Sequence, residues 1–164
     1  ARAKDSSTVF DHVALQGLWR AKTLQGDEAG AMDVWNQAEV ILREDAYGNA
    51  FGHPRELARL LLERGDEKDL PEAFSLLQRE LANRRDPVTL ELTAWVFMRM
   101  NQYADARIMI QEALTQGFQE VSIYYRAGVI EEKLGNTEKA KQYFDQSLTI
   151  DPTFNAETWR ELEL

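Results

Sequence analysis

The chain has 164 residues, of which 44% are hydrophobic, and its formal net charge is −9. Its length and apolar content suffice for a domain with a hydrophobic core, and its lack of cysteine excludes disulfides, thiol catalysis and cysteine-ligated metal sites. The acidic balance argues against nucleic acid and anionic membrane surfaces as partners, because both attract proteins with positive charge.

No apolar run approaches the roughly 18 residues of a membrane span, so we expect no membrane insertion. The first residues, ARAKDSSTVFDH, contain neither an initiator methionine nor the apolar core of a signal peptide. We interpret the chain as a piece of a longer protein or as a processed one. A chain without cysteine is compatible with both the cytoplasm and the periplasm, so the compartment stays unknown.

Apolar residues recur along the chain at intervals of three and four, as amphipathic helices require, whereas strand-like alternation is absent over any useful length. The sequence therefore predicts an all-α protein that forms a single domain over residues 1–164. The expected elements are four helix pairs and a terminal helix: residues 12–45, 54–86, 87–120, 121–152 and 155–164.

An irregular connector is predicted at residues 46–53, between the first and second helix pairs. The surrounding stretch REDAYGNAFGHP contains two glycines, an asparagine and a proline, which disfavour a regular helix. We expect the aromatic residues Tyr47 and Phe51 to fold back onto the helices.

Three helix starts are marked by residue type. Asp86 is an N-cap candidate followed by a proline at the first helical position, and residues 53–54 repeat this arrangement with a histidine. Asp69 is expected to cap the helix that begins near residue 70.

Alanines recur at a nearly constant interval across the four pairs. Counting back from Ala140, alanines stand at 106, 73 and 31, which are separations of 34, 33 and 42 residues. We predict that Ala140 and Gly128 are small because two helices cross there, where a larger side chain would cost about 1–3 kcal/mol. Gly135 is predicted to adopt the left-handed conformation that ends a helix, and Asn101 fills the same place one pair earlier.

This pattern resembles the tetratricopeptide repeat, a 34-residue antiparallel helix pair. The resemblance covers roughly residues 9–152 and is most specific in the last two pairs, because Trp19 and Leu61 in the first two are larger than the usual residue. It implies a right-handed α-solenoid of about four repeats plus a C-terminal helix. The last pair carries the motif through Tyr124, Ala127, Gly128, Gly135, Ala140, Phe144, Ser147 and Pro152.

The resemblance also implies that the first helices of successive pairs line a concave groove. The groove positions carry six basic and three acidic side chains, a net charge of +3 that leaves −12 for the rest. A groove more positive than its surroundings favours an acidic segment. The residues predicted to bind the partner are Arg55, Arg59, Leu62, Glu91, Leu92, Trp95, Met98, Arg99, Tyr125, Arg126, Val129 and Lys133.

Several of these residues are apolar or aromatic and could form a patch at mid-groove. Tryptophan, tyrosine, methionine and arginine are enriched in binding hot spots. The alternative for Trp95 is a place in the core, since aromatic residues at helical spacing usually pack there.

Motifs of catalysis are absent from the sequence. There is no phosphate-binding loop or GxGxxG motif, and the histidines, His12 and His53, do not have the spacing of metal ligands. Carboxylate pairs such as Glu131 and Glu132 are expected on helix exteriors. We therefore predict no enzyme activity, no cofactor and no metal site. Some members of the family that the sequence resembles hold the C-terminal carboxylate of chaperones in a clamp that needs asparagines. These asparagines are absent here, so we do not predict binding of chaperone tails.

These features together predict a non-catalytic protein–protein interaction module that binds a peptide or protein segment in its concave groove. The alternative is a structural or oligomerisation segment of a larger protein, which packs on itself or on a neighbouring domain. Self-association would be the sign of this second function.

Overall fold

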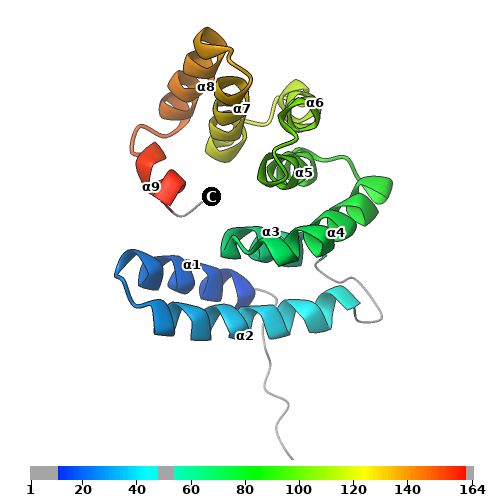
Figure 1. Ribbon diagram of the computed structural model, residues 1–164, viewed down its shortest axis with the longest axis vertical. Coiled ribbons are helices and arrows are strands. Elements are labelled where there is room, and N and C mark those ends of the chain that lie inside the picture. Colours follow the sequence, from blue (N-terminus) through cyan, green and yellow to red (C-terminus); the bar gives the residue numbers. More distant parts are fainter. Residues whose placement is uncertain (1–10, 48–53, 162–164) are drawn as a thin grey trace, which may run out of the picture.

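The computed structural model describes residues 11–47 and 54–161, and every regular element within these ranges is a helix. The helices follow one another as pairs along a curved stack (Figure 1). This arrangement confirms the predicted all-α solenoid. The elements are α1 (Asp11–Leu24), α2 (Glu28–Tyr47), α3 (Pro54–Arg64), the 3-10 helix η1 (Glu67–Asp69), α4 (Leu70–Asn83), α5 (Pro87–Arg99), α6 (Tyr103–Thr115), α7 (Val121–Lys133), α8 (Thr137–Ile150) and α9 (Ala156–Glu161).

The first helices of the pairs form the inner side of the stack. Each helix packs most closely against its partner within the pair, and α3 and α7 both contact α5. The terminal helix α9 turns back toward the concave side, where it lies between α7 and α1 (Figure 1). Among the described residues, no helix is long and apolar enough to cross a bilayer.

The hydrophobic core follows the stack in two clusters. The first cluster joins α2, α3, α4 and α5 around buried residues such as Trp35, Leu42 and Leu61. The second joins α5, α6 and α7 around Leu90 and Ile110. Helix α5 contributes buried residues to both clusters and so joins the two parts of the core.

The turns inside the last two pairs have the predicted conformation. Asn101 and Gly135 have φ angles of 58° and 80°. After each of them, an amide bonds to the carbonyl five residues back: Gln102 N to Phe97 O, and Asn136 N to Glu131 O, both at 2.8 Å. These bonds satisfy carbonyls that the helix end would leave without a partner.

The crossing of α7 and α8 requires glycine at position 128. A Cβ atom at Gly128 would lie 2.5 Å from the ring of Phe144. This distance is shorter than any van der Waals contact, so a methyl group there would force the ring to move. The prediction that Gly128 is small because two helices meet is confirmed.

The predicted helix caps differ in outcome. Asp86 accepts hydrogen bonds from the amides of Val88 and Thr89, both at 3.1 Å, which confirms it as an N-cap. Asp69 stands at the N-cap position of α4, as expected, but its side chain makes no cap hydrogen bond. Its backbone is already helical at the end of η1, and its carboxylate instead accepts from Arg64 Nε at 2.6 Å.

Helix α2 continues through Tyr47, two residues into the segment predicted as an irregular connector. The Tyr47 hydroxyl donates to Glu72 Oε1 at 2.7 Å, so this side chain folds back onto α4 as expected. Residues 48–53, which include Phe51 and His53, lie outside the described residues. Pro54 begins α3, and α9 lies within the range predicted for the terminal helix.

Candidate partner-binding site

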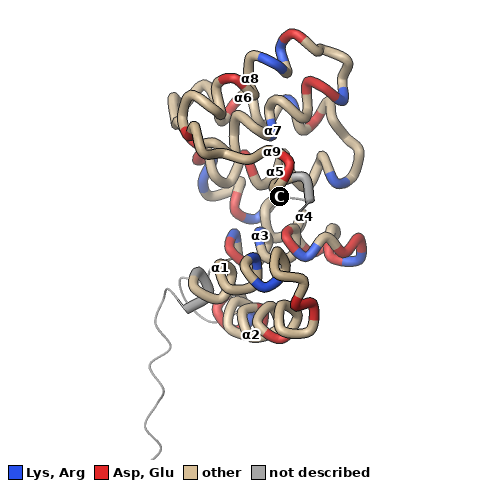
Figure 2. Tube along the Cα trace, turned by 90° about the vertical axis from the view of Figure 1, so that its left-hand side faces the viewer, with Lys and Arg blue, Asp and Glu red and all other residues tan. Residues whose placement is uncertain are grey.

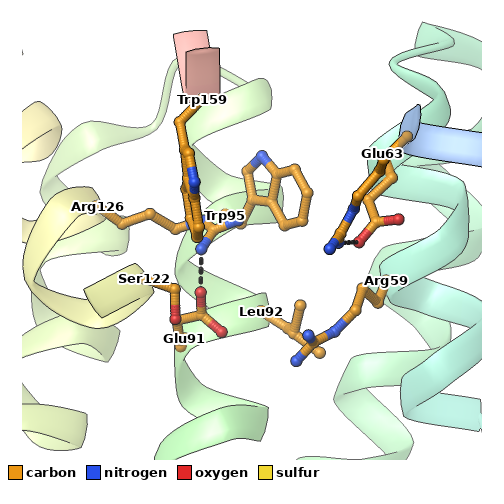
Figure 3. Close-up of a pocket in the computed structure, with 9 residues that line it drawn as sticks. Arg59, Glu63, Glu91, Leu92, Trp95, Ser122, Arg126 and Trp159 are labelled. Carbon is orange, nitrogen blue, oxygen red and sulfur yellow. Dashed lines mark hydrogen bonds and ion pairs between the residues drawn. The ribbon is translucent and has the colours of Figure 1, made fainter. Parts of the chain in front are cut away.

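A small cavity lies on the concave side of the stack, and we name it the concave pocket. Side chains from α1, α3, α5, α7 and α9 converge on it (Figure 3). Its volume is about 30 Å³. The described residues that line it are Arg20, Arg59, Glu63, Glu91, Leu92, Trp95, Ser122, Arg126 and Trp159.

The repeat explains why residues so far apart in sequence meet here. Arg59, Leu92 and Arg126 are separated by 33 and 34 residues, so they occupy equivalent positions on α3, α5 and α7. Stacking of the pairs brings equivalent positions side by side on the inner surface. The helices α3, α5 and α7 therefore all contribute side chains to the same pocket.

One wall of the pocket is a buried ion pair between α7 and α5. Arg126 Nη1 donates to Glu91 Oε1, and only 4% of either side chain is exposed. The Arg126 guanidinium lies 4.0 Å from the ring centroid of Trp95 and 5.8 Å from that of Trp159. Burial lowers the pKa of Arg126, and the nearby Glu91 carboxylate opposes this shift.

The opposite wall carries a second ion pair, between α1 and α3. Arg20 Nη2 donates to Glu63 Oε1, and here the arginine side chain is 37% exposed while the glutamate is buried. Burial raises the pKa of Glu63, although Arg20 and Arg59 act in the other direction. The second carboxylate oxygen, Oε2, is buried and has no hydrogen-bond partner in the described structure.

Among the described lining residues, Arg59 is the arginine that forms no ion pair. It is half-buried on α3, and within the described ranges it forms no hydrogen bond or ion pair. The described lining holds three arginines against two glutamates. Since each glutamate already pairs with another arginine, Arg59 is available to a carboxylate from outside, and such charge-assisted hydrogen bonds are strong.

Aromatic rings close the pocket on the side of α9. The Tyr125 ring centroid lies 5.4 Å from that of Trp159 and 5.5 Å from that of Phe154. The Phe154 and Trp159 rings are 5.2 Å apart, and all three contacts are edge-on. Such pairs contribute about 0.5–1.5 kcal/mol each beyond the area that they bury.

The structure brings five of the twelve sequence-predicted residues into the pocket, and these five are Arg59, Glu91, Leu92, Trp95 and Arg126. Trp95 is 3% exposed, so it packs with the core while one face lines the cavity. Tyr125 is also buried and lies next to the pocket, against α9.

The other predicted residues lie around this pocket. Leu62 belongs to the first core cluster, and Met98 packs against the second. Arg55 pairs with Asp86 and Glu56, and Arg99 donates to the Gly65 carbonyl at 2.6 Å. Val129 is half-buried, and Lys133 is exposed.

Four residues of the pocket are absent from the predicted set. Arg20 and Ser122 stand at groove positions of the repeat, so the register could have identified them. Glu63 follows Arg59 by one helical turn, which is a weaker signal. Trp159 belongs to no complete pair, and no periodicity points to it.

Charged residues elsewhere do not separate into faces. Figure 2 shows acidic and basic residues interspersed along the helices, without a continuous basic side. In the part of the chain that the structure describes, no group of three or more histidine, aspartate or glutamate side chains is placed to hold a metal ion.

Comparison with known proteins gives two findings. The sequence model of the tetratricopeptide repeat family matches residues 121–154. A solved structure named MamA MSR-1 C2 matches over 94% of this chain and 88% of that one, with a TM-score of 0.50 and 15% identity, so the likeness concerns the fold. No curated protein matches the chain. Residues 121–154 thus match a single tetratricopeptide repeat, and the chain as a whole shares the fold of that solved structure.

Proposed function

We propose that the chain is a non-catalytic module that holds a segment of another protein on its concave side, where an acidic group of that segment pairs with Arg59. Tetratricopeptide repeats generally mediate protein–protein interaction. The observation that carries the finer proposal is Arg59, a half-buried residue that lines the concave pocket and forms no hydrogen bond or ion pair with another described residue.

The surroundings of Arg59 favour recognition of a carboxylate. The two ion pairs fix the pocket walls, so little side-chain entropy is lost when a ligand binds there. Arginine and tryptophan in a desolvated pocket are typical of binding hot spots, and Trp95 and Arg126 have this arrangement. A carboxylate would supply the acceptor that Arg59 lacks.

A displayed library of short random peptides, selected on the intact chain, tests the proposal. We expect the selected peptides to be enriched in aspartate, glutamate or a free C-terminal carboxylate. Their affinity should fall about tenfold in Arg59→Gln, which corresponds to roughly 1.4 kcal/mol for the loss of one charged hydrogen bond. The binding should also weaken as salt concentration rises.

Arg79→Gln is the matched control, because Arg79 is exposed on α4 outside the concave pocket and the substitution removes the same charge. This variant should bind the selected peptides with the same affinity as the wild type. Selection of peptides without carboxylates, with equal affinity for Arg59→Gln, would contradict the proposal.

A second candidate function is assembly through the first helix pair. Of the large hydrophobic side chains that are exposed in the described structure, most lie on α1 and α2. These are Leu18, Leu24, Met32, Val40 and Tyr47. Exposed apolar groups of this kind often mark interaction surfaces when they lie together.

Light scattering over a range of concentrations distinguishes this candidate. Assembly through α1 and α2 predicts an oligomer that Leu24→Glu and Val40→Glu convert to a monomer without loss of helicity. A monomer at every concentration would exclude it.

A further inference from the structure

The helix α9 differs from the other helices in how it is attached. Every helix from α1 to α8 packs along a partner, whereas α9 makes no comparably close approach to any helix. In the part of the chain that the structure describes, the rings of Phe154 and Trp159 contact Tyr125, and Trp159 also lies against the guanidinium of Arg126. Both anchoring side chains remain partly exposed.

The segment that connects α8 to α9 allows the two helices to separate. Helix α8 ends at Ile150, and Asn155 caps α9 through the amides of Glu157 and Thr158, at 2.9 and 3.2 Å. Pro152, Thr153 and Asn155 are exposed. Since α9 has its own cap, it could leave the groove without disturbing the hydrogen bonds of α8.

With α9 in place, the concave pocket is too small for a partner. A volume of about 30 Å³ accommodates a few water molecules at most, not a peptide segment with its side chains. Trp159 is the only described lining residue that comes from outside the four helix pairs. A protein segment that fills this pocket with a side chain while its carboxylate pairs with Arg59 would therefore take the place of Trp159.

We propose that α9 is a displaceable occupant of the partner site, and that the partner is a segment with an aromatic side chain close to a carboxylate. This inference rests on the function proposed above. The aromatic ring takes the position of Trp159 against Tyr125 and Arg126, and the carboxylate pairs with Arg59.

The features left behind by α9 explain this choice of partner. Without Trp159, Tyr125 would lose one of its ring contacts, and the Arg126 guanidinium would lose one of its two aromatic neighbours. Arginine is attracted to aromatic faces, most of all to that of tryptophan. A ligand with an aromatic ring alone would restore these contacts but would leave Arg59 unsatisfied.

Intramolecular occupation lowers the apparent affinity of the partner by the fraction of molecules in which the site is open. Loosening α9 should therefore strengthen binding. The free peptide with the sequence of residues 151–164 is a suitable probe, because it carries the tryptophan together with glutamates and a terminal carboxylate.

The experiment measures the affinity of this labelled peptide, by fluorescence anisotropy, for the full-length chain and for Phe154→Ala/Trp159→Ala. We expect the double variant to bind at least tenfold more tightly than the wild type. Adding Arg59→Gln to that variant, or replacing the tryptophan of the peptide by alanine, should reduce its affinity again. Glu157→Ala, at an exposed position of α9, is the control and should behave as the wild type.

Equal affinity of the wild type and the double variant, or no binding to the double variant while its helicity is unchanged, would overturn the proposal. If the double variant unfolds, Trp159→Ala alone serves the same comparison. Should library peptides bind through Arg59 while the 151–164 peptide does not distinguish the variants, this inference fails and the proposed function stands. If neither ligand binds, both fail.

A second measurement needs no ligand and uses the absence of cysteine from the chain. Ser122→Cys places one thiol at the pocket wall, and Ser75→Cys places one at an exposed position of α4. With α9 in the groove, the thiol at 122 should react with a maleimide at least tenfold faster in the double variant than in the otherwise wild-type chain. The thiol at 75 should react equally in both, and equal rates at 122 would contradict the occupation of the pocket by α9.

Discussion

The last two helix pairs and the first pair differ in how closely their two helices can pack. The turns of the first pair and of pairs α5/α6 and α7/α8 all contain a residue with positive φ, but α7 meets α8 at a glycine. The first pair instead has Trp19 where the repeat has a small residue, and its second helix is 20 residues long. It also carries most of the exposed apolar side chains of the described structure.

The two ion pairs of the concave pocket follow this division. Arg126 and Glu91 join the regular pairs and are both buried, whereas Arg20 is half-exposed where α1 meets α3. The regular pairs therefore shield their ion pair from water. On the side of the first pair, the arginine of the ion pair stays accessible to water. Small residues that recur at regular intervals allow neighbouring helices to approach closely. The charged side chains on the inner faces of these helices then also come close together.

The largest expected effect comes from breaking the buried pair. Arg126→Ala should destabilise the chain by about 3–5 kcal/mol, because it leaves Glu91 buried without a counter-charge. Arg20→Ala should cost less, about 1–2 kcal/mol, because water already reaches the partly exposed side of that ion pair. Urea unfolding followed by circular dichroism measures both, and similar losses would show that the two walls do not differ.

A smaller effect is expected from adding one methyl group to each region. Gly128→Ala should cost about 1–3 kcal/mol, because the new Cβ would press on the Phe144 ring. Gly17→Ala in α1 should instead stabilise by about 0.5–1 kcal/mol, since no heavy atom lies within 4 Å of its Cβ and alanine favours a helix. If Gly17→Ala also lowers stability, the first pair and the last pair do not differ in how they accept an added methyl group.

The smallest expected effect is the pH dependence of the stability contributed by Glu63, on the Arg20 side of the pocket. Because burial raises the pKa of Glu63, the folded chain holds this proton more tightly than the unfolded chain does. Stability from this group is present below the ordinary glutamate pKa and decreases as pH rises through the higher folded pKa. Glu63→Gln should lack this decrease.

The measurement is urea unfolding of both chains at pH values from 4 to 7, with Glu157→Gln as the exposed control. The stability difference between wild type and Glu63→Gln should move against the wild type as the pH rises. A difference that is constant, or that moves in favour of the wild type, would mean that Arg20 compensates fully for burial.

Much of the fold could be predicted because its determinants are local. The spacing of apolar residues identified the helix pairs, and single residues such as Gly128, Gly135 and Asp86 have the roles expected of them. The family resemblance further placed Arg59, Trp95 and Arg126 on the inner helices. The side chain of Asp69 does not cap α4, because the 3-10 helix before it gives it a helical backbone conformation, which residue type alone does not reveal.

The sequence by itself determined the helices, their pairing and the side of each helix that faces inward, because these depend on spacings within about 34 residues. Only the tertiary structure decided that Arg126 pairs with Glu91, that Arg59 is left without a carboxylate, and that Trp159 closes the pocket. These contacts depend on the curvature of the stack and on the return of α9 to its concave side. No periodic pattern encodes either of them.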